Sequence, residues 1–259
     1  MIAHVSHRAE AELKAINDLL NGNTCGFVAN GAKVYISSRK ATICDKVAAE
    51  LSKQGPGQCL SIPADLQSSD DIEKLVAKLS ECEPHGLHVL VNNAGANWGE
   101  ALSTYPDESF DKVMTLNVRR IFTLTQKCVP LLEKATKRED PARIINIGSV
   151  DGIRVPALET YAYSASKAAV HHMSRVLAAH LGRRQITVNA VAPGPFPSQM
   201  MNATLDKHHD SIIQGIPLER VGVPSDMAGV CLYLASKAGS YVNGALIAVD
   251  GGSIIAPKL

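Results

Sequence analysis

Residues 143–167, RIINIGSVDGIRVPALETYAYSASK, contain the pattern that decides the fold of this 259-residue chain. The run RIINI (143–147) is β-branched and apolar, which is typical of a strand buried on both faces. Residues 161–182 carry apolar side chains at three- and four-residue spacing, which predicts a helix. A buried strand followed by an amphipathic helix is the repeating unit of an α/β fold with a parallel sheet.

The same alternation continues from residue 33 to the end of the chain. Further strands are predicted at KVYIS (33–37), CLSI (59–62), VLVN (89–92), ITVNAV (186–191) and ALIAV (245–249), and further helices over 40–53, 69–81, 108–137 and 225–236. No repeat or linker interrupts them, so we expect a single domain with a Rossmann-like, doubly wound parallel sheet. The irregular stretch 193–224, rich in Pro, Gly, Asn and Met, is expected to form a mobile lid.

Composition excludes several classes of protein. Lys and Arg number 26 against 25 Asp and Glu, so no net charge favours nucleic acid or an anionic membrane as a partner. Six scattered cysteines without a C-x-x-C pair argue against a zinc ribbon or a disulfide framework. No apolar segment is suited to secretion or to crossing a membrane, so a cytoplasmic location is expected. The final Pro257-Lys258-Leu259 is close to a peroxisomal signal, and we favour a chance match.

Polar residues at strand ends indicate where chemistry takes place. Tyr163 and Lys167 stand four apart and would share one face of a helix, whereas Ser149 ends the strand RIINI. Asn92-Asn93-Ala94-Gly95 and Pro193-Gly194 follow two other strands, and ligands of open α/β sheets bind at such ends. Taken singly, the helix pair could be a surface accident and the serine a turn cap.

Together these motifs resemble the short-chain dehydrogenase/reductase family, whose members share NNAG, a strand-end serine, Y-x-x-x-K and a PG turn in this order. The resemblance covers roughly residues 26–252, including LNV around Asn117, IPLERVGVPSD and the closing VDGG. It implies an oxidoreductase that acts on a small-molecule carbonyl or alcohol, most similar to 3-oxoacyl reductases. It also implies a homodimer or homotetramer that pairs through 108–137 and 161–182.

The resemblance assigns a role to each catalytic residue. Tyr163 would protonate the carbonyl oxygen, or act as the base in the oxidative direction, and Ser149 would hydrogen-bond that oxygen. A phenol has an ordinary pKa near 10, so Lys167 and the oxidised nicotinamide would favour the phenolate and lower that pKa. Lys167 would also hold the nicotinamide ribose, and Asn117 would keep a water in a proton relay.

Cofactor choice in this family depends on the end of the second strand, here Ser37-Ser38-Arg39-Lys40. Ser38 stands where NAD-dependent members have a carboxylate, and Arg39 can hold a 2′-phosphate in a bidentate fork, so NADP(H) is favoured over NAD(H). The alternative is a solvated Arg-Lys pair. Asp65 matches an acidic residue near the adenine, with a helix cap as its alternative. The remaining cofactor-binding residues implied are Asn92, Ala94, Gly95, Pro193 and Gly194.

The amino-terminal part departs from the family pattern. The glycine-rich turn T-G-x-x-x-G-x-G is missing, and 8–20 instead has the spacing of an amphipathic helix. We therefore divide the chain into an atypical, helical segment 1–25 and a Rossmann domain 26–259 whose first strand and glycine turn are replaced or absent. Three alternatives would explain this departure from the family pattern. We favour a mistaken or alternative start of the sequence. The others are a variant with impaired cofactor binding and a site that is rebuilt from other residues. The alternative to an enzyme is a non-catalytic homologue that acts as an oligomer partner or regulator.

Two further groups of residues carry weaker signals. The pairs His171-His172 and His208-His209 lack the ligands that would complete a metal site, so no metal is expected. Six residues could either shape a substrate pocket or pack ordinary loops, and these are Asn97, Trp98, Asp151, Arg154, Val155 and Phe196.

Overall fold

A seven-stranded sheet forms the centre of the computed structural model, which describes residues 2–4, 19–197 and 201–257, with side chains from residue 24 onward except those of 202–204. The strand order is β3-β2-β1-β4-β5-β6-β7. The strands are β1 (Ile2–His4), β2 (Lys33–Ile36), β3 (Gln58–Ser61), β4 (Val89–Asn92), β5 (Ala142–Ile147), β6 (Ile186–Pro193) and β7 (Leu246–Val249). Apart from the pairs that β1 makes, neighbouring strands are parallel, so the predicted parallel sheet and its six predicted strands are confirmed.

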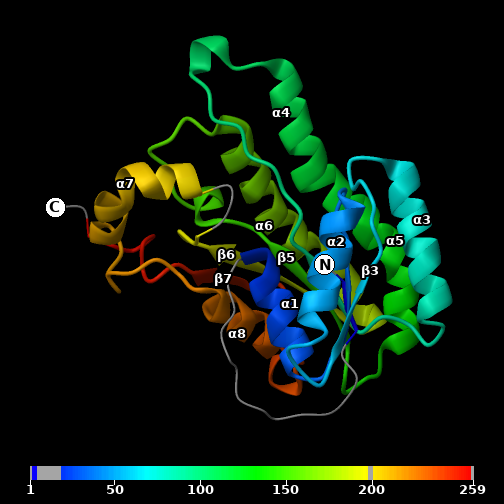
Figure 1. The fold of residues 1–259 in the computed structure, drawn as a ribbon. Coiled ribbons are helices and arrows are strands. Elements are labelled where there is room, and N and C mark those ends of the chain that lie inside the picture. The colour runs from blue at the N-terminus through cyan, green and yellow to red at the C-terminus, as the bar shows by residue number, and fades with distance from the viewer. Residues whose placement is uncertain (1, 5–18, 198–200, 258–259) are drawn as a thin grey trace.

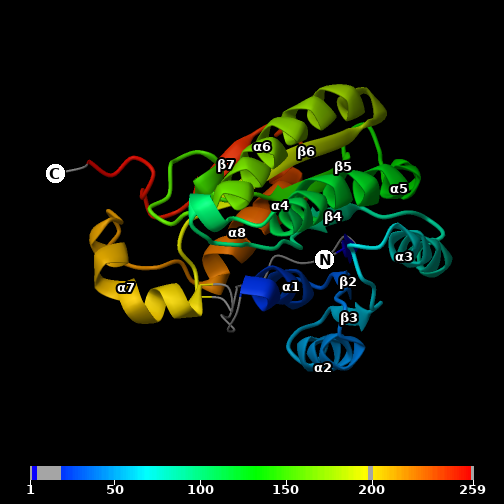
Figure 2. The same cartoon turned by 90° about the horizontal axis from the view of Figure 1, so that it is seen from above.

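Helices cover both faces of this sheet (Figures 1 and 2). On one face lie α3 (Ser69–Cys82), α5 (Arg120–Ala135) and α6 (Tyr161–Leu181), and on the other lie α1 (Leu19–Ala29), α2 (Ala41–Leu51) and α8 (Pro224–Ala235). Helix α4 (Asp107–Met114) precedes α5. Helix α7 (Asn202–Gln214) falls within the expected lid and lies beside the residues that follow β7 at one end of the molecule (Figure 1).

The core consists of two apolar layers separated by the sheet. In β4, Val89 and Val91 belong to the layer under α1 and α8, whereas Leu90 belongs to the layer under α3 and α5. In β5, Ile145 belongs to the layer under α1 and α8, and Ile144 belongs to the layer under α3 and α5. Successive side chains of a strand point to opposite faces, so a strand covered on both sides must be apolar at every position. This is why the strands could be predicted from unbroken apolar runs.

Strand β1 differs from the parallel pattern of the other strands. It lies between β2 and β4 and pairs antiparallel with both, with Ile2 opposite Tyr35 on one side and Leu90 on the other. β1 therefore occupies the central position of the sheet. Because it runs antiparallel to its neighbours, its last residue, His4, lies at the edge where β2 begins, which is the amino edge of the parallel strands. Of the helix expected over 8–20, residues 8–18 lie outside the described part, and Leu19 and Leu20 belong to the first turn of α1. Gly31, at φ 83°, makes the predicted turn between α1 and β2.

The helix expected over 108–137 is interrupted. A π-helical turn, Thr115–Arg119, separates α4 from α5, and the Arg120 amide bonds back to the carbonyl of Thr115. Such turns insert one extra residue into a helix and are frequent at functional sites. Here the turn contains Asn117, whose side chain bonds outside the helix, and sequence spacing alone did not predict this break.

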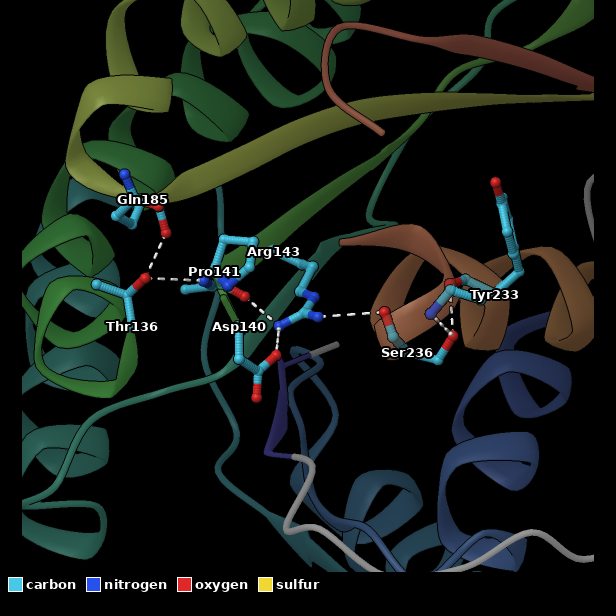
Figure 3. A network of polar contacts seen from close by, with 9 residues as sticks. Thr136, Asp140, Pro141, Arg143, Gln185, Tyr233 and Ser236 are labelled. Atoms are coloured by element: carbon cyan, nitrogen blue, oxygen red, sulfur yellow. Dashed lines mark hydrogen bonds and ion pairs between the residues drawn. The ribbon is translucent and has the colours of Figure 1, made fainter. Parts of the chain in front are cut away.

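At the amino edge of the sheet, Arg143 of β5 connects distant parts of the chain (Figure 3). Its buried guanidinium forms an ion pair with Asp140 and donates to the carbonyls of Pro141 and Ser236, the latter at 3.1 Å. Ser236 is the C-cap of α8, so this hydrogen bond satisfies a carbonyl at the end of that helix. The network lies opposite the carboxyl edge and stabilises the fold.

Candidate active site

Three strand ends meet at the carboxyl edge of the sheet, because β4, β5 and β6 are adjacent and parallel. The loop after β4 begins at Asn93, β5 is followed by Gly148 and Ser149, and β6 ends at Pro193. Gly194 donates to the Val249 carbonyl at 3.0 Å, which ties the third loop to the end of β7. The segments that carry the predicted site residues are therefore neighbours in space.

Ser149, Tyr163 and Lys167 come together next to the end of β5. Tyr163 and Lys167 lie one turn apart on α6, and the Lys167 Nζ is 5.5 Å from the centre of the Tyr163 ring. The Ser149 side chain hydrogen-bonds the Tyr163 hydroxyl. Lys167 Nζ donates to the Ile147 carbonyl at 2.9 Å, which anchors the ammonium to the last residue of β5. The structure thus brings the three predicted residues into one cluster.

Burial sets the pKa values in this cluster. Loss of solvent raises the pKa of Tyr163, the hydrogen bond from Ser149 partly lowers it, and the Asp151 charge raises it again. Loss of solvent lowers the pKa of Lys167 to about 8. Desolvation of the phenolate is the largest effect in the protein alone, so the lowered pKa expected from Lys167 together with the oxidised nicotinamide stays a prediction. At neutral pH Tyr163 keeps its proton and Lys167 its charge.

Asn117 fixes the loop that follows β4. Its side chain accepts from the Ala96 amide at 2.8 Å and donates to the Ala96 carbonyl and to Ser166 Oγ, both at 2.9 Å. Both amide hydrogens are thereby used, which leaves only acceptor capacity on Oδ1. A Cβ placed on Gly95 would lie 3.4 Å from that oxygen and 3.6 Å from Lys167 Nζ, so Asn117 and Lys167 border the same loop. Its role as a water ligand stays a prediction.

A buried chain of polar side chains runs beneath the site, and sequence reasoning missed most of it. Asn92 Nδ2 donates to Thr125 Oγ1 at 3.1 Å and to Asn146 Oδ1 at 2.8 Å, and Asn146 donates to Ser174 Oγ at 2.8 Å. The chain therefore joins α5, β4, β5 and α6. Its available signal was an asparagine inside the apolar run RIINI, since a buried amide needs partners. The side-chain donors of Asn92 are used here, so contact with a cofactor would involve its Oδ1 or its backbone.

The residues predicted to bind the adenosine end lie at the ends of β2 and β3. Ser38 and Arg39 are exposed, and Arg39 forms no ion pair with the described residues. The buried Ser37 Oγ next to them likewise has no hydrogen-bond partner in the described part of the chain. Asp65 Oδ1 accepts from the Gln67 amide at 2.9 Å, while Ser68 is the N-cap of α3.

A cleft adjoins Asp65 and extends to the loop after β4. Its lining residues are Leu66, Val91, Asn92, Asn93, Ala94, Leu116, Arg120, Ile121 and Leu124. It contains Asn92 and Ala94, two of the residues predicted to bind the cofactor, whereas the unpartnered Ser37 hydroxyl and the exposed Arg39 lie outside its lining. Lys167 makes one hydrogen bond with the described residues and retains two N–H donors for a ribose. The donors of Arg39 and Lys167 are of the kinds that the phosphate and the ribose of a nicotinamide cofactor require.

The diphosphate between these ends would meet α1. Helix α1 ends at the amino edge, where β2 begins, so its first turn at Leu19 faces the carboxyl edge. Free amides of a helical first turn attract phosphate. The missing glycine turn would have preceded this helix, and residues 5–18 lie outside the described part.

The six residues that could shape a substrate pocket differ in how deeply their side chains are buried. Phe196 is buried and packs against Gly222, where an added Cβ would lie 2.3 Å from the ring, so it supports the 193–224 segment from within. Trp98 and Val155 are exposed at 40% and 94%. Asp151 is half-buried and pairs with Arg154 at 3.5 Å, and its amide donates to Ser149 Oγ at 3.2 Å. Asn97 is half-buried, and its Oδ1 has no partner in the described chain.

The histidine pairs do not act together. His171 is buried and His172 exposed, whereas His208 and His209 are both exposed. Within the described residues, no group of three or more His, Cys, Asp or Glu side chains could hold a metal ion. The described helices include none with the length and apolar character to cross a membrane.

Known proteins resemble this chain over most of its length. A family profile described as Enoyl-(Acyl carrier protein) reductase matches residues 23–253. The rhamnolipids biosynthesis 3-oxoacyl-[acyl-carrier-protein] reductase of Pseudomonas aeruginosa is 43% identical over 229 residues, 88% of each chain. The 3-oxoacyl-[acyl-carrier-protein] reductase FabG of Thermotoga maritima is 34% identical over 242 residues, 93% of this chain and 95% of that one.

Solved structures agree with this similarity. The structure described as the Pseudomonas aeruginosa RhlG/NADP active-site complex superposes with a TM-score of 0.86 at 42% identity, covering 90% of each chain. A short-chain type dehydrogenase/reductase from Mycobacterium marinum gives a TM-score of 0.83 at 29% identity, covering 91% of each.

Proposed function

Because this chain belongs to the short-chain dehydrogenase/reductase family, we propose that it is an NADP(H)-dependent reductase that converts the ketone of a 3-oxoacyl group to a hydroxyl. The observation that carries the proposal is the cluster of Ser149, Tyr163 and buried, charged Lys167 at the carboxyl edge of the sheet. Such a cluster offers a proton donor, a hydrogen-bond donor and a cation around one point.

Each residue of the cluster has a distinct task in this reaction. Tyr163, protonated at neutral pH, donates its proton to the carbonyl oxygen, and Ser149 donates a hydrogen bond to the same oxygen. Lys167 then stabilises the phenolate through its charge, from 5.5 Å away. The reduced cofactor, when bound, supplies the hydride. In the oxidative direction Tyr163 would accept the proton.

Arg39 and Ser38 support NADP(H) as the preferred cofactor. Arg39 is exposed and unpaired within the described chain, and Ser38 provides no carboxylate to repel a 2′-phosphate. Asp65 and the cleft beside it would receive the adenine. The loops after β4 and β6 would border the nicotinamide half through Asn92, Ala94, Gly95, Pro193 and Gly194, with the 193–224 segment as a lid.

Exposed apolar side chains near the cluster support an acyl substrate. Two loops leave the carboxyl edge side by side, since the Glu100 amide donates to the Glu159 carbonyl at 3.2 Å. They expose large apolar residues, namely Trp98, Leu102, Ile153, Val155 and Leu158. Exposed apolar surface of this kind commonly marks a binding groove. A fatty acyl chain could lie along it while its ketone reaches Tyr163.

The experiment compares Tyr163→Phe with Tyr161→Phe, a matched control on the same helix whose hydroxyl bonds to Glu159. Purified protein is assayed for NADPH oxidation with 3-oxoacyl thioesters of two chain lengths. We expect Tyr163→Phe to lower kcat at least about 100-fold while the NADPH dissociation constant stays unchanged, and Tyr161→Phe to stay active. Retained turnover in Tyr163→Phe would refute the assigned proton donor.

The second candidate is a non-catalytic oligomer partner or regulator, and the antiparallel β1 favours it because the family's glycine turn has no equivalent in the described chain. Cofactor binding separates the two candidates. NADPH and NADH are titrated while the fluorescence of Trp98, the chain's single tryptophan, and the melting temperature are followed. The reductase predicts a response to NADPH, and the regulator predicts none to either nucleotide.

A homodimer or homotetramer is also proposed. The helices through which pairing is expected expose Phe110 on α4, Phe122 on α5 and Val176 on α6. Burying these side chains against a second copy would remove apolar surface from water. Sedimentation velocity measures the assembly, and a species with the mass of one chain at micromolar concentration would contradict it.

A further inference from the structure

His171 occupies a slot beside the Ser149 turn, where Gly148 leaves room for its ring and Gly152 lies close both to the ring and to the backbone of α6. It lies one helical turn after Lys167 on α6 and is buried. A Cβ on Gly148 would lie 2.1 Å from His171 Nε2, and a Cβ on Gly152 would lie 2.8 Å from its Cε1. The ring therefore packs directly on the backbone at both sides of Ser149.

Two hydrogen bonds join the ring to this turn. The Ser149 amide donates to His171 Nε2 at 3.4 Å, and the ring also bonds to the backbone of Gly152. A neutral imidazole has one donor and one acceptor nitrogen, so a ring that accepts at Nε2 donates from Nδ1. The bond to the Gly152 backbone raises the pKa of the ring, which is the effect of a carbonyl acceptor, so we infer that the Gly152 carbonyl receives that hydrogen.

The surroundings favour the neutral ring. Burial lowers the pKa of His171 to about 4, and the charges of Lys167 and Arg175 on the same helix act in the same direction. A charged ring would also direct an N–H group at the Ser149 amide. Electrostatics thus indicate a neutral ring, and the hydrogen bond from the Ser149 amide indicates that its proton is on Nδ1.

We propose that His171, neutral and protonated on Nδ1, is a positioning residue that clamps the 148–152 turn and so holds the Ser149 hydroxyl beside Tyr163. This inference rests on the proposed reductase function for its kinetic consequence, but its structural part stands separately. The Ser149 hydroxyl also accepts from the Asp151 amide at 3.2 Å, so rotation of the turn would move both partners. A hydrogen bond that strengthens as charge develops on the substrate oxygen affects kcat more than KM.

The kinetic test uses three variants. His171→Leu removes both ring hydrogen bonds, whereas His171→Gln can place an amide oxygen near the Nε2 position and accept from Ser149. His172→Gln is the matched control, because His172 is the exposed neighbour. We expect His171→Leu to lower kcat about 10- to 100-fold, while KM and NADPH affinity change less than about 2-fold. His171→Gln should recover most of kcat. His172→Gln should have the same kcat as the original chain.

Equal kcat values for His171→Leu and the original chain would overturn the proposal, and so would equal losses in His171→Leu and His171→Gln. A second pair tests the slot itself. Gly148→Ala should lower kcat in the original chain, because the new methyl displaces the ring, but should have little further effect in His171→Ala. Additive losses would show that the ring is not what the methyl displaces.

A further measurement uses the unaltered protein, so its result depends neither on enzymatic activity nor on whether a variant folds. Nitrogen-15 NMR of the histidine rings at pH 7 distinguishes the two neutral tautomers and the charged form. We expect one ring, assigned by its loss in His171→Gln, to be neutral with its proton on Nδ1. A ring protonated on Nε2 or on both nitrogens would overturn the proposal even if the reductase is active. An inactive chain with the expected tautomer would refute the reductase function but leave the clamp supported.

Discussion

Replacing Lys167 with methionine is expected to make the protein more stable while abolishing its reductase activity. Lys167 is 4% exposed, and burial lowers its pKa from 10.5 to about 8. The difference of about 2.5 pH units corresponds to about 3 kcal/mol of unfavourable free energy for the charged form in the folded state. Methionine has a similar length without the charge, so the substitution removes this cost.

One interaction is lost in return. Lys167 Nζ donates to the Ile147 carbonyl, and a hydrogen bond from a charged donor contributes about 2 kcal/mol. The net expectation at pH 7 is therefore a gain of about 1 kcal/mol in the free energy of unfolding, or about 2–4 °C in Tm for a chain of this size. Activity is lost because no cation remains beside Tyr163.

The pH dependence has a definite sign. A lysine whose pKa is lower in the folded than in the unfolded state binds fewer protons when folded, so stability rises with pH between about 8 and 10.5. The cost attached to Lys167 is about 3 kcal/mol at pH 7 and about 1 kcal/mol at pH 10. The advantage of Lys167→Met over the original chain should shrink by about 2 kcal/mol across that interval.

Urea unfolding at pH 7 and pH 10, without added nucleotide, measures both effects. Lys53→Met, an exposed lysine just beyond α2, is the control and should change stability by less than about 0.5 kcal/mol at either pH. A Lys167→Met variant less stable than the original chain at pH 7, or an advantage independent of pH, would refute the reasoning from desolvation.

Three further outcomes are expected. Arg39→Ala should weaken NADPH binding about 10- to 100-fold in a fluorescence titration while NADH binding hardly changes, and an equal loss in exposed Arg138→Ala would contradict this. Arg143→Leu should lower the urea unfolding free energy by about 3 kcal/mol, since it removes the guanidinium donor from the Pro141 and Ser236 carbonyls; a loss under 1 kcal/mol would contradict this. Gly31→Ala should cost about 1–2 kcal/mol in the same assay because φ is 83°, and unchanged stability would contradict a strained turn.

Much of the fold could be predicted because local patterns encode it. An apolar run such as RIINI marks a strand covered on both faces, and the helices between the strands follow from three- and four-residue spacing. The positions of Ser149, Tyr163 and Lys167 followed in turn, since parallel strands present their carboxyl ends at one edge and residues four apart share a helical face. The three form a cluster as expected.

Other features had no local signal. Strand β1 is three residues long, too short for any periodicity, and its antiparallel direction depends on pairing with β2 and β4. The π-helical turn at Asn117 depends on bonds to Ala96, 21 positions away. The raised pKa of Tyr163 follows from how much solvent the fold removes, which no neighbour in the sequence determines.

The sequence by itself determined the α/β architecture and which side chains gather at the carboxyl edge, because these depend on residues within a turn or two of one another. Tertiary structure alone decided how those side chains are held and charged. The His171 slot between Gly148 and Gly152, the single carbonyl partner of Lys167 and the contact between Arg143 and Ser236 all join residues about 20 to 90 positions apart. Contacts over such separations depend on the path of the whole chain, and so do the pKa values that follow from them.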